Sequence, residues 1–395
     1  MKRRILFFSC AALVCALFFF GCGNSKSAAS QSPAENTASA AGADSRRSLA
    51  ITRANNFAIE YLPDQAKLLT DSDGNKRLLI PKGREAPPGY EGIQIIPTPI
   101  NNALYTATPQ VGFIDALSKA LGDDSLFASI GGVMNAREEW VIPQILEGLE
   151  KGTIEFIPQD FRTVINIESV VSLSPELVFT GGLSEAQVLL RAMLDEAGIP
   201  YVTVTNWTEP DNDAGLEWLK FFAAFYNLDE LADELFEAKL ARMEELSKIT
   251  AGIPDSQRPT VAMGMVYDGI VYTQGGQSTT AQELYRAGGL YAFRDAPGRA
   301  GINLGMEEFI NRARDADVLI YTSLAEYCPD KKALLDADPL LGELKAFKED
   351  RIFILGKGYY MNSAGADEKF LDTVFMLHPE LLEGYTLINY MRLPD

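Results

Sequence analysis

The fold is indicated by the stretch NIESVVSLSPELVFT, residues 166–180, and by a second stretch with the same layout, GMEEFINRARDADVLIY, residues 305–321. Each is predicted to begin with a short helix that has a glutamate near its start, Glu168 in the first and Glu307 or Glu308 in the second. A break follows, and then an apolar run short enough to be a buried strand. The repetition predicts two similar α/β lobes, with a cleft between them and a matched carboxylate on each.

The first residues predict export from the cytoplasm. Lys2, Arg3 and Arg4 precede an apolar run over residues 5–20, which is shorter than the roughly 20 residues that a helix needs to cross a bilayer. The run ends at Gly21-Cys22, which is similar to a bacterial lipobox, whose cysteine receives a diacylglycerol. We therefore expect a lipoprotein signal peptide over residues 1–21, a lipidated Cys22 and a flexible Ser- and Ala-rich tether over residues 22–49. The alternative is an ordinary signal peptide with an incidental cysteine.

Charge and cysteine content narrow the possible partners. The chain carries a net charge of −19, and loss of the three basic leader residues takes this to −22. Such a charge argues against nucleic acid or an anionic membrane surface as the partner. Only Cys328 remains once the leader is removed and Cys22 is acylated, so no internal disulfide is expected. We expect a monomer that its lipid holds at the outer face of the cytoplasmic membrane.

The mature chain divides into blocks with different patterns. Residues 50–92 predict a β-rich extension, with a hairpin turn at residues 71–75. Residues 93–213 alternate strands and helices and predict a first lobe, in which an apolar run at 126–130 is taken as a strand. Residues 214–257 are helical, and residues 258–395 resume the alternation as a second lobe. The predicted fold class is α/β, with two doubly wound lobes, mostly parallel sheets and a small N-terminal β-rich extension.

One helix of the linking block is predicted to act as a strut. It is expected to start near residue 229, to contain about 21 residues and so to span about 30 Å. A single helix of that length between two lobes permits only a small closing motion. Its predicted apolar stripe consists of Leu231, Leu235, Ala238, Met243 and Leu246.

On these features the chain resembles the ferric-siderophore and vitamin B12 class of ABC-transporter substrate-binding proteins, whose lobes are bridged by one backbone helix. The resemblance covers residues 93–382. It rests on NIE at 166–168 with LSPELV at 173–178, GIP at 198–200, GGQS at 275–278, LKAFKEDRIF at 344–353 and LHPE at 377–380. It departs from the family pattern at residues 315–317, where a proline is missing.

The resemblance also implies a partner, an ABC permease with its ATPase. In that family a glutamate on each lobe meets basic residues of the permease. Glu168 matches the first of these, and Glu308 is taken as the second, with Glu307 as a rival. The alternative is that each is an exposed glutamate placed favourably at the start of a helix.

The ligand is expected beyond the carboxyl ends of the strands, as in other open α/β sheets. The loops there carry arginines, aromatic rings and small polar side chains. Guanidinium groups suit the anionic oxygens of hydroxamate or catecholate chelates, and rings suit flat or conjugated ligands. Taken singly, each residue could equally have a packing or surface role. The predicted ligand-binding residues are Tyr105, Thr106, Thr108, Arg137, Trp140, Arg162, Trp207, Tyr267, Gln277, Arg294, Arg299, Tyr359 and Tyr360.

Histidine content bears on the cargo. His378 is the only histidine, so the chain cannot build the histidine clusters with which importers of bare zinc or manganese hold their metal. We predict a prechelated cargo, a ferric siderophore, with cobalamin or haem as alternatives, and neither a direct metal site nor a cofactor. No phosphate-binding loop and no His-Glu-x-x-His motif occurs, so an enzyme is not expected. A tethered ligand sensor and a secreted hydrolase are alternatives from other functional classes.

Overall fold

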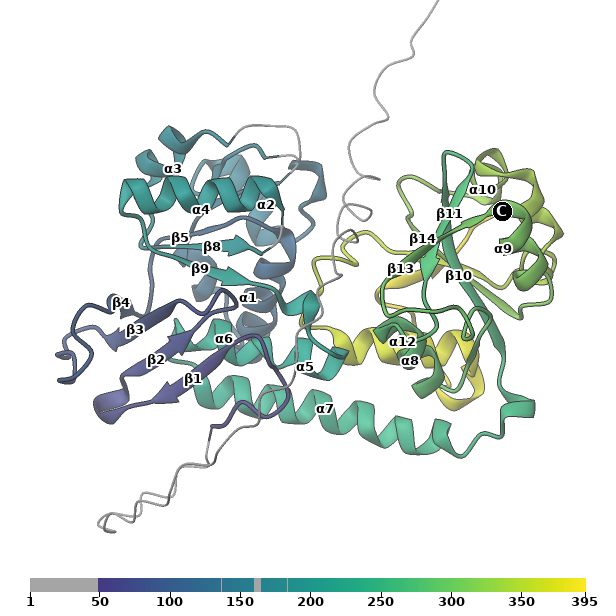
Figure 1. Cartoon of the computed structure of the whole chain (residues 1–395), viewed down its shortest axis with the longest axis horizontal. Helices are drawn as coiled ribbons and strands as arrows, with labels where there is room; N and C mark the ends of the chain where they lie inside the picture. The colour runs from purple at the N-terminus through teal and green to yellow at the C-terminus, as the bar shows by residue number, and fades with distance from the viewer. Residues whose placement is uncertain (1–48, 136, 160–164, 183) are drawn as a thin grey trace, which may run out of the picture.

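The computed structural model describes residues 49–395 apart from 136, 160–164 and 183, and it shows two α/β lobes joined along one side by a long helix (Figure 1). The predicted signal peptide, Cys22, Arg162 and all of the predicted tether except residue 49 lie outside these residues. The described chain contains three separate β-sheets, one in each lobe and one in the N-terminal extension. The predicted fold class is confirmed. Within the described ranges, no helix combines the length and the apolar character needed to span a membrane.

The first lobe, called the N-lobe, is built on a parallel sheet in the order β7-β6-β5-β8-β9. Its strands are β5 (Ala103–Tyr105), β6 (Ile130–Val133), β7 (Glu155–Phe156), β8 (Leu177–Gly181) and β9 (Tyr201–Val204). Helices pack on both faces of this sheet, and their apolar side chains belong to two separate hydrophobic cores, one on each face. One core receives α1 (Thr108–Leu121) and α2 (Pro143–Lys151), and the other receives α3 (Ile167–Leu173) and α4 (Glu185–Ala197).

The strand predicted at residues 126–130 is wrong. Residues 125–129 form a 3₁₀ turn in which the Ser129 hydroxyl donates to the Leu126 carbonyl over 2.6 Å, and β6 begins only at Ile130. The strand contains Gly131 and Gly132, which by composition resemble a loop. Both positions are tightly packed, because an added Cβ would lie 1.8 Å from the Asn102 side chain at Gly131 and 2.7 Å from that of Leu173 at Gly132, so these side chains would have to shift. Tertiary packing thus overrides the weak strand propensity of glycine.

The second lobe, called the C-lobe, has a mixed sheet in the order β13-β11-β10-β14-β15-β16, with β12 also paired to β10. The central pairs β10–β14 and β14–β15 are parallel, and the outer pairs are antiparallel. The strands are β10 (Thr260–Tyr267), β11 (Ile270–Gln274), β12 (Leu290–Tyr291), β13 (Gly301–Gly305), β14 (Val318–Leu324), β15 (Ile352–Leu355) and β16 (Tyr390–Arg392). The helices are α8 (Thr279–Arg286), α9 (Met306–Ala313), α10 (Lys331–Ala337), α11 (Lys345–Lys348) and α12 (Ala366–Leu377).

The linking block contains the predicted strut. After α5 (Asn212–Leu216) and the wholly buried α6 (Trp218–Ala224), α7 (Asp229–Ala251) runs for 23 residues along the lower side of both lobes (Figure 1). Its buried stripe differs from the predicted one, because α6 and α12 together determine which side of α7 is covered. Ala238 is exposed, Leu231 and Leu235 are half-buried, and Met243 and Leu246 are buried as predicted. The buried apolar residues are Ala232, Phe236, Leu240, Met243 and Leu246.

The N-terminal extension forms a four-stranded sheet of its own. Its strands are β1 (Ala58–Tyr61), β2 (Lys67–Thr70), β3 (Lys76–Pro81) and β4 (Gln94–Thr98), and the last lies beyond the predicted extension boundary at residue 92. The predicted hairpin turn at 71–75 joins β2 and β3. It also covers the edge strand β9, because the Asp71 carboxylate accepts from the Thr203 amide and the Ser72 amide donates to the Thr203 carbonyl. The extension therefore satisfies backbone groups that an uncovered sheet edge would expose.

The segment that precedes β1 is bound to the N-lobe by two buried carboxylates. Glu217 accepts the backbone amides of residues 52–54 at 2.7–2.9 Å, and Glu209 accepts those of residues 55 and 56 at 2.9 and 3.0 Å. Lys220, also buried, donates to Glu217 and to the Ala50 carbonyl. These residues tie the chain that follows the predicted tether to α5 and α6.

Candidate functional site

The two lobes touch directly where the loop after β15 meets α1. Gly112 on α1 packs against the backbone of that loop, and a Cβ added to Gly112 would lie only 1.7 Å from the Met361 carbonyl oxygen. Val141, just before α2, approaches Gly358 closely, since a Cβ added to Gly358 would lie 2.8 Å from Val141 Cγ2. The loop that follows the carboxyl end of β15 therefore lies against the N-lobe.

We predict that Gly112→Ala disturbs this contact between the lobes. Both partners are backbone, so α1 or the 358–363 loop must move to make room, and overpacking of this kind costs about 1–3 kcal/mol of the free energy of unfolding. Denaturant unfolding measures the loss, and small-angle scattering measures the separation of the lobes. Gly215→Ala is the matched control, because its added Cβ meets Asn206 at an ordinary 3.4 Å and lies within a helix. Equal stability of the Gly112 variant and the parent would contradict the prediction.

On the N-lobe side, the predicted residues Thr106 and Thr108 belong to a buried polar cluster at the carboxyl end of β5. Gln110 Oε1 accepts the Thr106 amide at 3.0 Å, and Gln187 Oε1 accepts the Thr106 hydroxyl at 3.3 Å. Gln110 Nε2 is buried and has no hydrogen-bond acceptor among the described residues. Buried donors of this kind are rare, because most buried polar groups find a hydrogen-bond partner.

Two other predicted N-lobe residues are core residues. Tyr105 is buried, its ring stacks on Phe179 with centroids 4.7 Å apart, and its hydroxyl lies 2.7 Å from that of Tyr226. Trp140 is 1% exposed and its indole donates to the Met134 carbonyl at 3.1 Å. Packing of this kind leaves little of either ring for a ligand in this conformation. Large aromatic rings are the residues for which a core and a site role are hardest to separate in a sequence.

The remaining N-lobe residues are at the surface. Arg137 is exposed, and its guanidinium donates to the Leu149 carbonyl at 3.3 Å. Trp207 follows β9 and is 45% exposed. In the C-lobe, the predicted residue Tyr267 at the end of β10 is also at the surface. Its side chain is 38% exposed, and its ring centroid lies 6.5 Å from that of Tyr272.

The C-lobe brings three predicted residues together. Gln277, Arg294 and Arg299 are exposed on two loops that backbone hydrogen bonds join, from Gly276 to the Ala296 carbonyl at 2.9 Å and from Gln277 to the Gly298 carbonyl at 3.1 Å. The close approach requires glycine, because a Cβ on Gly276 would lie 2.2 Å from the Arg294 carbonyl oxygen. The two loops thereby form one rigid edge that carries the exposed side chains of Gln277, Arg294 and Arg299, and the Arg294 guanidinium also donates to the Tyr291 carbonyl at 3.3 Å. Guanidinium groups on this edge can bind anionic oxygens.

Tyr359 and Tyr360 lie in the loop that contacts the N-lobe. Their rings meet edge to face with centroids 5.3 Å apart, and the Tyr359 hydroxyl lies 3.1 Å from that of Tyr390. Lys369 Nζ sits 4.4 Å from the centre of the Tyr359 ring. Burial lowers the pKa of Lys369 to about 8, although Glu368 and Asp372 oppose the shift. The loop thus brings an amine and two phenol rings into contact.

Sequence reasoning did not single out Gln110, Lys369 or Tyr390. A signal existed for Gln110, because a glutamine at the third position of a helix commonly reaches back to the helix start. Lys369 follows Asp367 and Glu368 in a pattern typical of a solvent-exposed helical turn, so its half-buried position beside the Tyr359 ring could not be predicted.

A polar contact also joins the lobes on the α5 side. Arg286 of α8 in the C-lobe lies 2.7 Å from Asp213 of α5, and Arg53 shares the same carboxylate at 3.4 Å. Glu283, one turn earlier on α8, lies 3.9 Å from Arg286. Burial raises the pKa of Glu283 to about 7, against the opposing effect of Arg286. These ion pairs connect the C-lobe to α5 and to the segment around Arg53.

The two predicted docking glutamates lie on corresponding helices. Glu168 is the second residue of α3, which leads into β8, and its amide donates to the capping Asn166 side chain at 3.1 Å. In α9, which leads into β14, Glu307 is the second residue and Glu308 the third. All three are exposed, and Glu308 lies 3.9 Å from Arg312 on its own helix. Counted from the helix start, Glu307 occupies the position of Glu168, and the docking role predicted for Glu168 and Glu308 stays a prediction.

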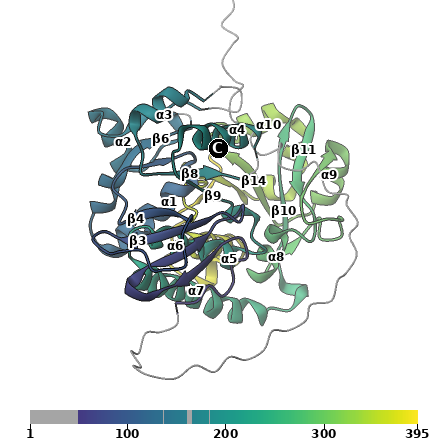
Figure 2. The same cartoon turned by 60° about the vertical axis from the view of Figure 1, so that its left-hand side comes forward.

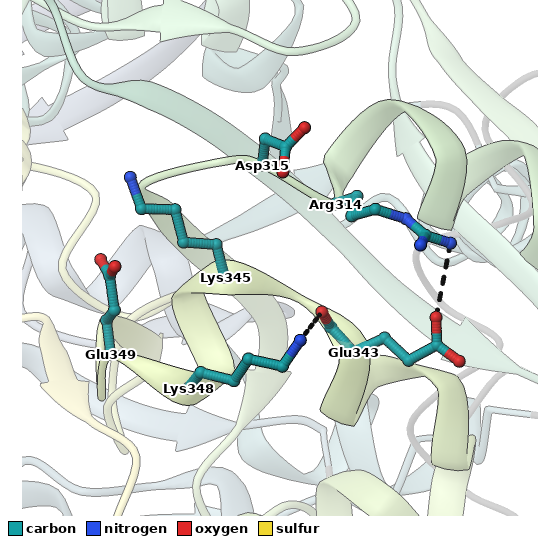
Figure 3. Close-up of a pocket in the computed structure, with 6 residues that line it drawn as sticks. All are labelled: Arg314, Asp315, Glu343, Lys345, Lys348 and Glu349. Carbon is teal, nitrogen blue, oxygen red and sulfur yellow. Dashed lines mark hydrogen bonds and ion pairs between the residues drawn. The ribbon is translucent and has the colours of Figure 1, made fainter.

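The C-lobe surface also has a hollow, which Figure 3 shows with the residues that line it. It is lined by Arg314, Asp315, Glu343, Lys345, Lys348 and Glu349. Arg314 is paired with Glu343 at 3.4 Å, and Lys348 donates to the Glu343 carbonyl at 2.7 Å. Its lining residues precede β14 or β15, so the hollow is at the amino ends of these strands, opposite the edge where a ligand is predicted.

No three His, Cys, Asp or Glu side chains in the described ranges are grouped so that they could hold a metal ion. His378 is buried, with Nε2 3.0 Å from the Gly288 carbonyl oxygen. Cys328 is buried too, and burial raises the pKa of its thiol to about 11. Neither side chain is presented as a metal ligand at the surface.

Comparison with known sequences identifies one family. The periplasmic binding protein family matches residues 155–359, slightly more than half of the chain. An uncharacterized lipoprotein of Methanocaldococcus jannaschii is 26% identical over 326 residues, which cover 80% of this chain and 76% of that protein. A second uncharacterized lipoprotein of that organism is 26% identical over 327 residues, covering 82% and 81%.

Solved structures share the fold. The siderophore periplasmic binding protein from the fuscachelin gene cluster of Thermobifida fusca has a TM-score of 0.52 and 19% identity, over 73% of this chain and 99% of that one. A possible iron-binding, periplasmic solute-binding protein from Staphylococcus epidermidis has a TM-score of 0.51 and 15% identity, over 71% and 99%. At such identities the likeness is one of fold.

Proposed function

Because this chain belongs to the periplasmic binding protein family, we propose that it captures a chelated iron complex outside the cytoplasm and delivers it to an ABC importer. The members of this family are solute-binding proteins rather than enzymes, and they work with a permease and an ATPase. The proposed cargo is a ferric siderophore, held between the N-lobe and the C-lobe.

The observation that carries the choice of cargo is the rigid edge with Gln277, Arg294 and Arg299. The chain as a whole has a net charge of −19, whereas this edge exposes two arginines, and the neighbouring Asp295 carboxylate is paired with Arg312. Ferric hydroxamates and catecholates present anionic oxygens that guanidinium forks bind well.

Haem is the second candidate, and the tyrosines favour it. Tyr359 and Tyr360 lie edge to face in the loop at the contact between the lobes, and Tyr360 is 43% exposed. A tyrosine oxygen can ligate haem iron, and neighbouring rings can pack against the porphyrin.

The lipid anchor at Cys22 is part of the proposal. Its support is the lipobox-like Gly21-Cys22 and the two lipoprotein relatives, which match about four-fifths of this chain. An anchored receptor would remain close to its permease, at the outer face of the cytoplasmic membrane.

The test is a titration of intrinsic tryptophan fluorescence with ferrichrome, a ferric catecholate, cobalamin and haem. Trp207 is the expected reporter, because it is 45% exposed while Trp140 and Trp218 are buried. We expect saturable quenching by a ferric siderophore. We also expect Arg294→Ala with Arg299→Ala to weaken binding at least about tenfold, since charge-assisted hydrogen bonds are worth about 1.5–3 kcal/mol each. The matched control is Arg84→Ala in the exposed loop between β3 and β4.

Two outcomes would contradict the proposal at different levels. Quenching by haem or cobalamin alone would replace the cargo but keep the transport function. Absence of saturable binding to every member of the panel would remove the chelate-binding function itself.

A further inference from the structure

The outer face of α3 and α4 on the N-lobe exposes large apolar side chains to water. Val188 and Leu189 of α4 are 52% and 51% exposed, and Val171 of α3 is 48% exposed. Ala192, one turn beyond Val188, is also exposed, while Leu190 and Leu194 of the same helix are buried. The spacing places the exposed set on one side of α4. The helices α3 and α4 contact each other, and both views show them together on the side of the N-lobe away from α7 (Figure 1, Figure 2).

The corresponding face of the C-lobe is chemically different. There α9 exposes Glu307, Glu308 and Asn311, and α10 exposes Lys332 and Asp336, which form an ion pair one turn apart. Neither of these two helices, which are described in full, exposes a large apolar side chain. Beside these two helices, the connection from β14 to β15 exposes the large apolar side chains of Tyr327 and Leu340, but α9 and α10 themselves differ in chemistry from α3 and α4.

We propose that Val171, Val188 and Leu189 form, together with Glu168, the N-lobe half of the surface that docks on the permease. The inference rests on the proposed transport function and deepens it. Glu168 and Val171 stand three residues apart on the exposed side of α3, so the apolar patch is continuous with the docking carboxylate. The partner that fits is a permease surface with a basic side chain surrounded by apolar ones.

Charge favours the permease over two other occupants. A twofold contact between copies of this chain would bring the Glu168 carboxylates and two strongly acidic bodies together, with a net charge of −19 on each chain. An anionic bilayer surface would repel the same charge. A basic permease residue instead complements Glu168, and apolar neighbours that exclude water strengthen such a pair.

The two halves of the docking surface then have different roles. The N-lobe half contributes buried apolar area, which salt does not screen, and the C-lobe half around Glu307 contributes exposed charge, which salt does screen. Because the halves differ, the protein would dock in one defined orientation. Its N-lobe would always face the half of the permease surface that is lined by apolar side chains.

The experiment measures binding of the chain to its importer in lipid nanodiscs by biolayer interferometry, at low and at high salt. A Cys22→Ser background removes the acyl chains without touching the described body. Val188→Thr with Leu189→Gln is expected to raise Kd about tenfold at both salt concentrations, as for loss of a buried apolar contact. Leu146→Gln is the matched control, because Leu146 is 43% exposed on α2, on the other face of the N-lobe sheet. Ferrichrome titration and thermal unfolding report whether the variants keep their fold.

The outcomes separate this inference from the function on which it rests. If Glu168→Ala weakens binding and the apolar double variant does not, the patch is not part of the docking surface, and the transport proposal stands. If neither weakens binding, the transport proposal fails with it. Loss of binding to empty nanodiscs in the double variant would assign the patch to the bilayer. Loss of a dimer in sedimentation would assign it to a second copy of this chain. Either assignment overturns the inference.

Discussion

Replacing Glu168 and Glu307 together with alanine is expected to lower uptake of the cargo by at least about a hundredfold, because a charge pair at an interface is worth about 2 kcal/mol or more and two are lost. Both side chains are exposed on the outer side of their helices, away from the core, so ligand affinity is expected to remain within about twofold of the parent. Uptake by cells or proteoliposomes measures the first effect, and fluorescence titration measures the second.

The matched control is the pair Glu168→Ala with Glu308→Ala. Glu308 is the third residue of α9 and already lies 3.9 Å from Arg312, whereas Glu307 occupies the same helix position as Glu168. This second pair is expected to lose no more uptake than Glu168→Ala alone. A greater loss with Glu308 than with Glu307 would reverse the assignment. Loss of ligand affinity in either pair would contradict a docking role for the glutamates.

Replacing Glu217 with alanine is expected to lower the free energy of unfolding by about 3–5 kcal/mol, the cost of removing one partner from a buried ion pair. Glu217 is fully buried, accepts three backbone amides from residues 52–54 and lies 3.1 Å from the ammonium of the buried Lys220. Without it, those amides lose their acceptor, and Lys220 keeps the Asp233 carboxylate at 2.9 Å and the Ala50 carbonyl at 3.1 Å. Denaturant unfolding measures the effect. Glu244→Ala, which removes an exposed partner of Arg53, is the control and is expected to cost less than about 1 kcal/mol.

The same residue predicts a dependence of stability on pH. Burial alone would raise the pKa of Glu217, but the amides of Ala54, Thr52 and Arg53 together with Lys220 lower it below the ordinary value of 4.5. An acid whose pKa is lower in the folded state stabilises the fold fully above its unfolded pKa, and the contribution is lost as pH falls through the folded pKa. Glu217 therefore contributes to a loss of stability below about pH 4.5, and Glu217→Ala is expected to make that loss shallower. An unchanged slope would contradict the role given to this carboxylate.

Local sequence was enough to predict the elements whose formation depends on their own residues. The repeated layout at 166–180 and 305–321 corresponds to α3 followed by β8 and to α9 followed by β14. The helix α4 begins after the capping Ser184 and ends at Gly198, which has a positive φ, and both signals are legible in the chain. The hairpin turn at 71–75 was predicted for the same reason, because turn residues act on their own backbone.

Packing decided the features that differed from prediction. Gly131 and Gly132 lie in a strand because β6 pairs with β5 and β7, and the side chains of Asn102 and Leu173 fill the space beside them. Trp140 and Tyr105 are held in the core by Met134 and Tyr226, and the ligand-binding role predicted for them stays a prediction. None of these contacts involves neighbours that a periodic pattern could reveal, since the partners belong to other elements.

The sequence by itself determined the two-lobed α/β architecture, the strut and the exposed glutamates at the starts of α3 and α9, because hydrophobic periodicity and capping residues act within a few positions of one another. Only the tertiary structure decided that Glu307 shares the helix position of Glu168, that Arg294 and Arg299 share a rigid edge, and that α4 presents an apolar outer face while α10 presents a charged one. Those properties depend on which surfaces the rest of the chain covers, and burial is a property of the whole fold rather than of any local segment.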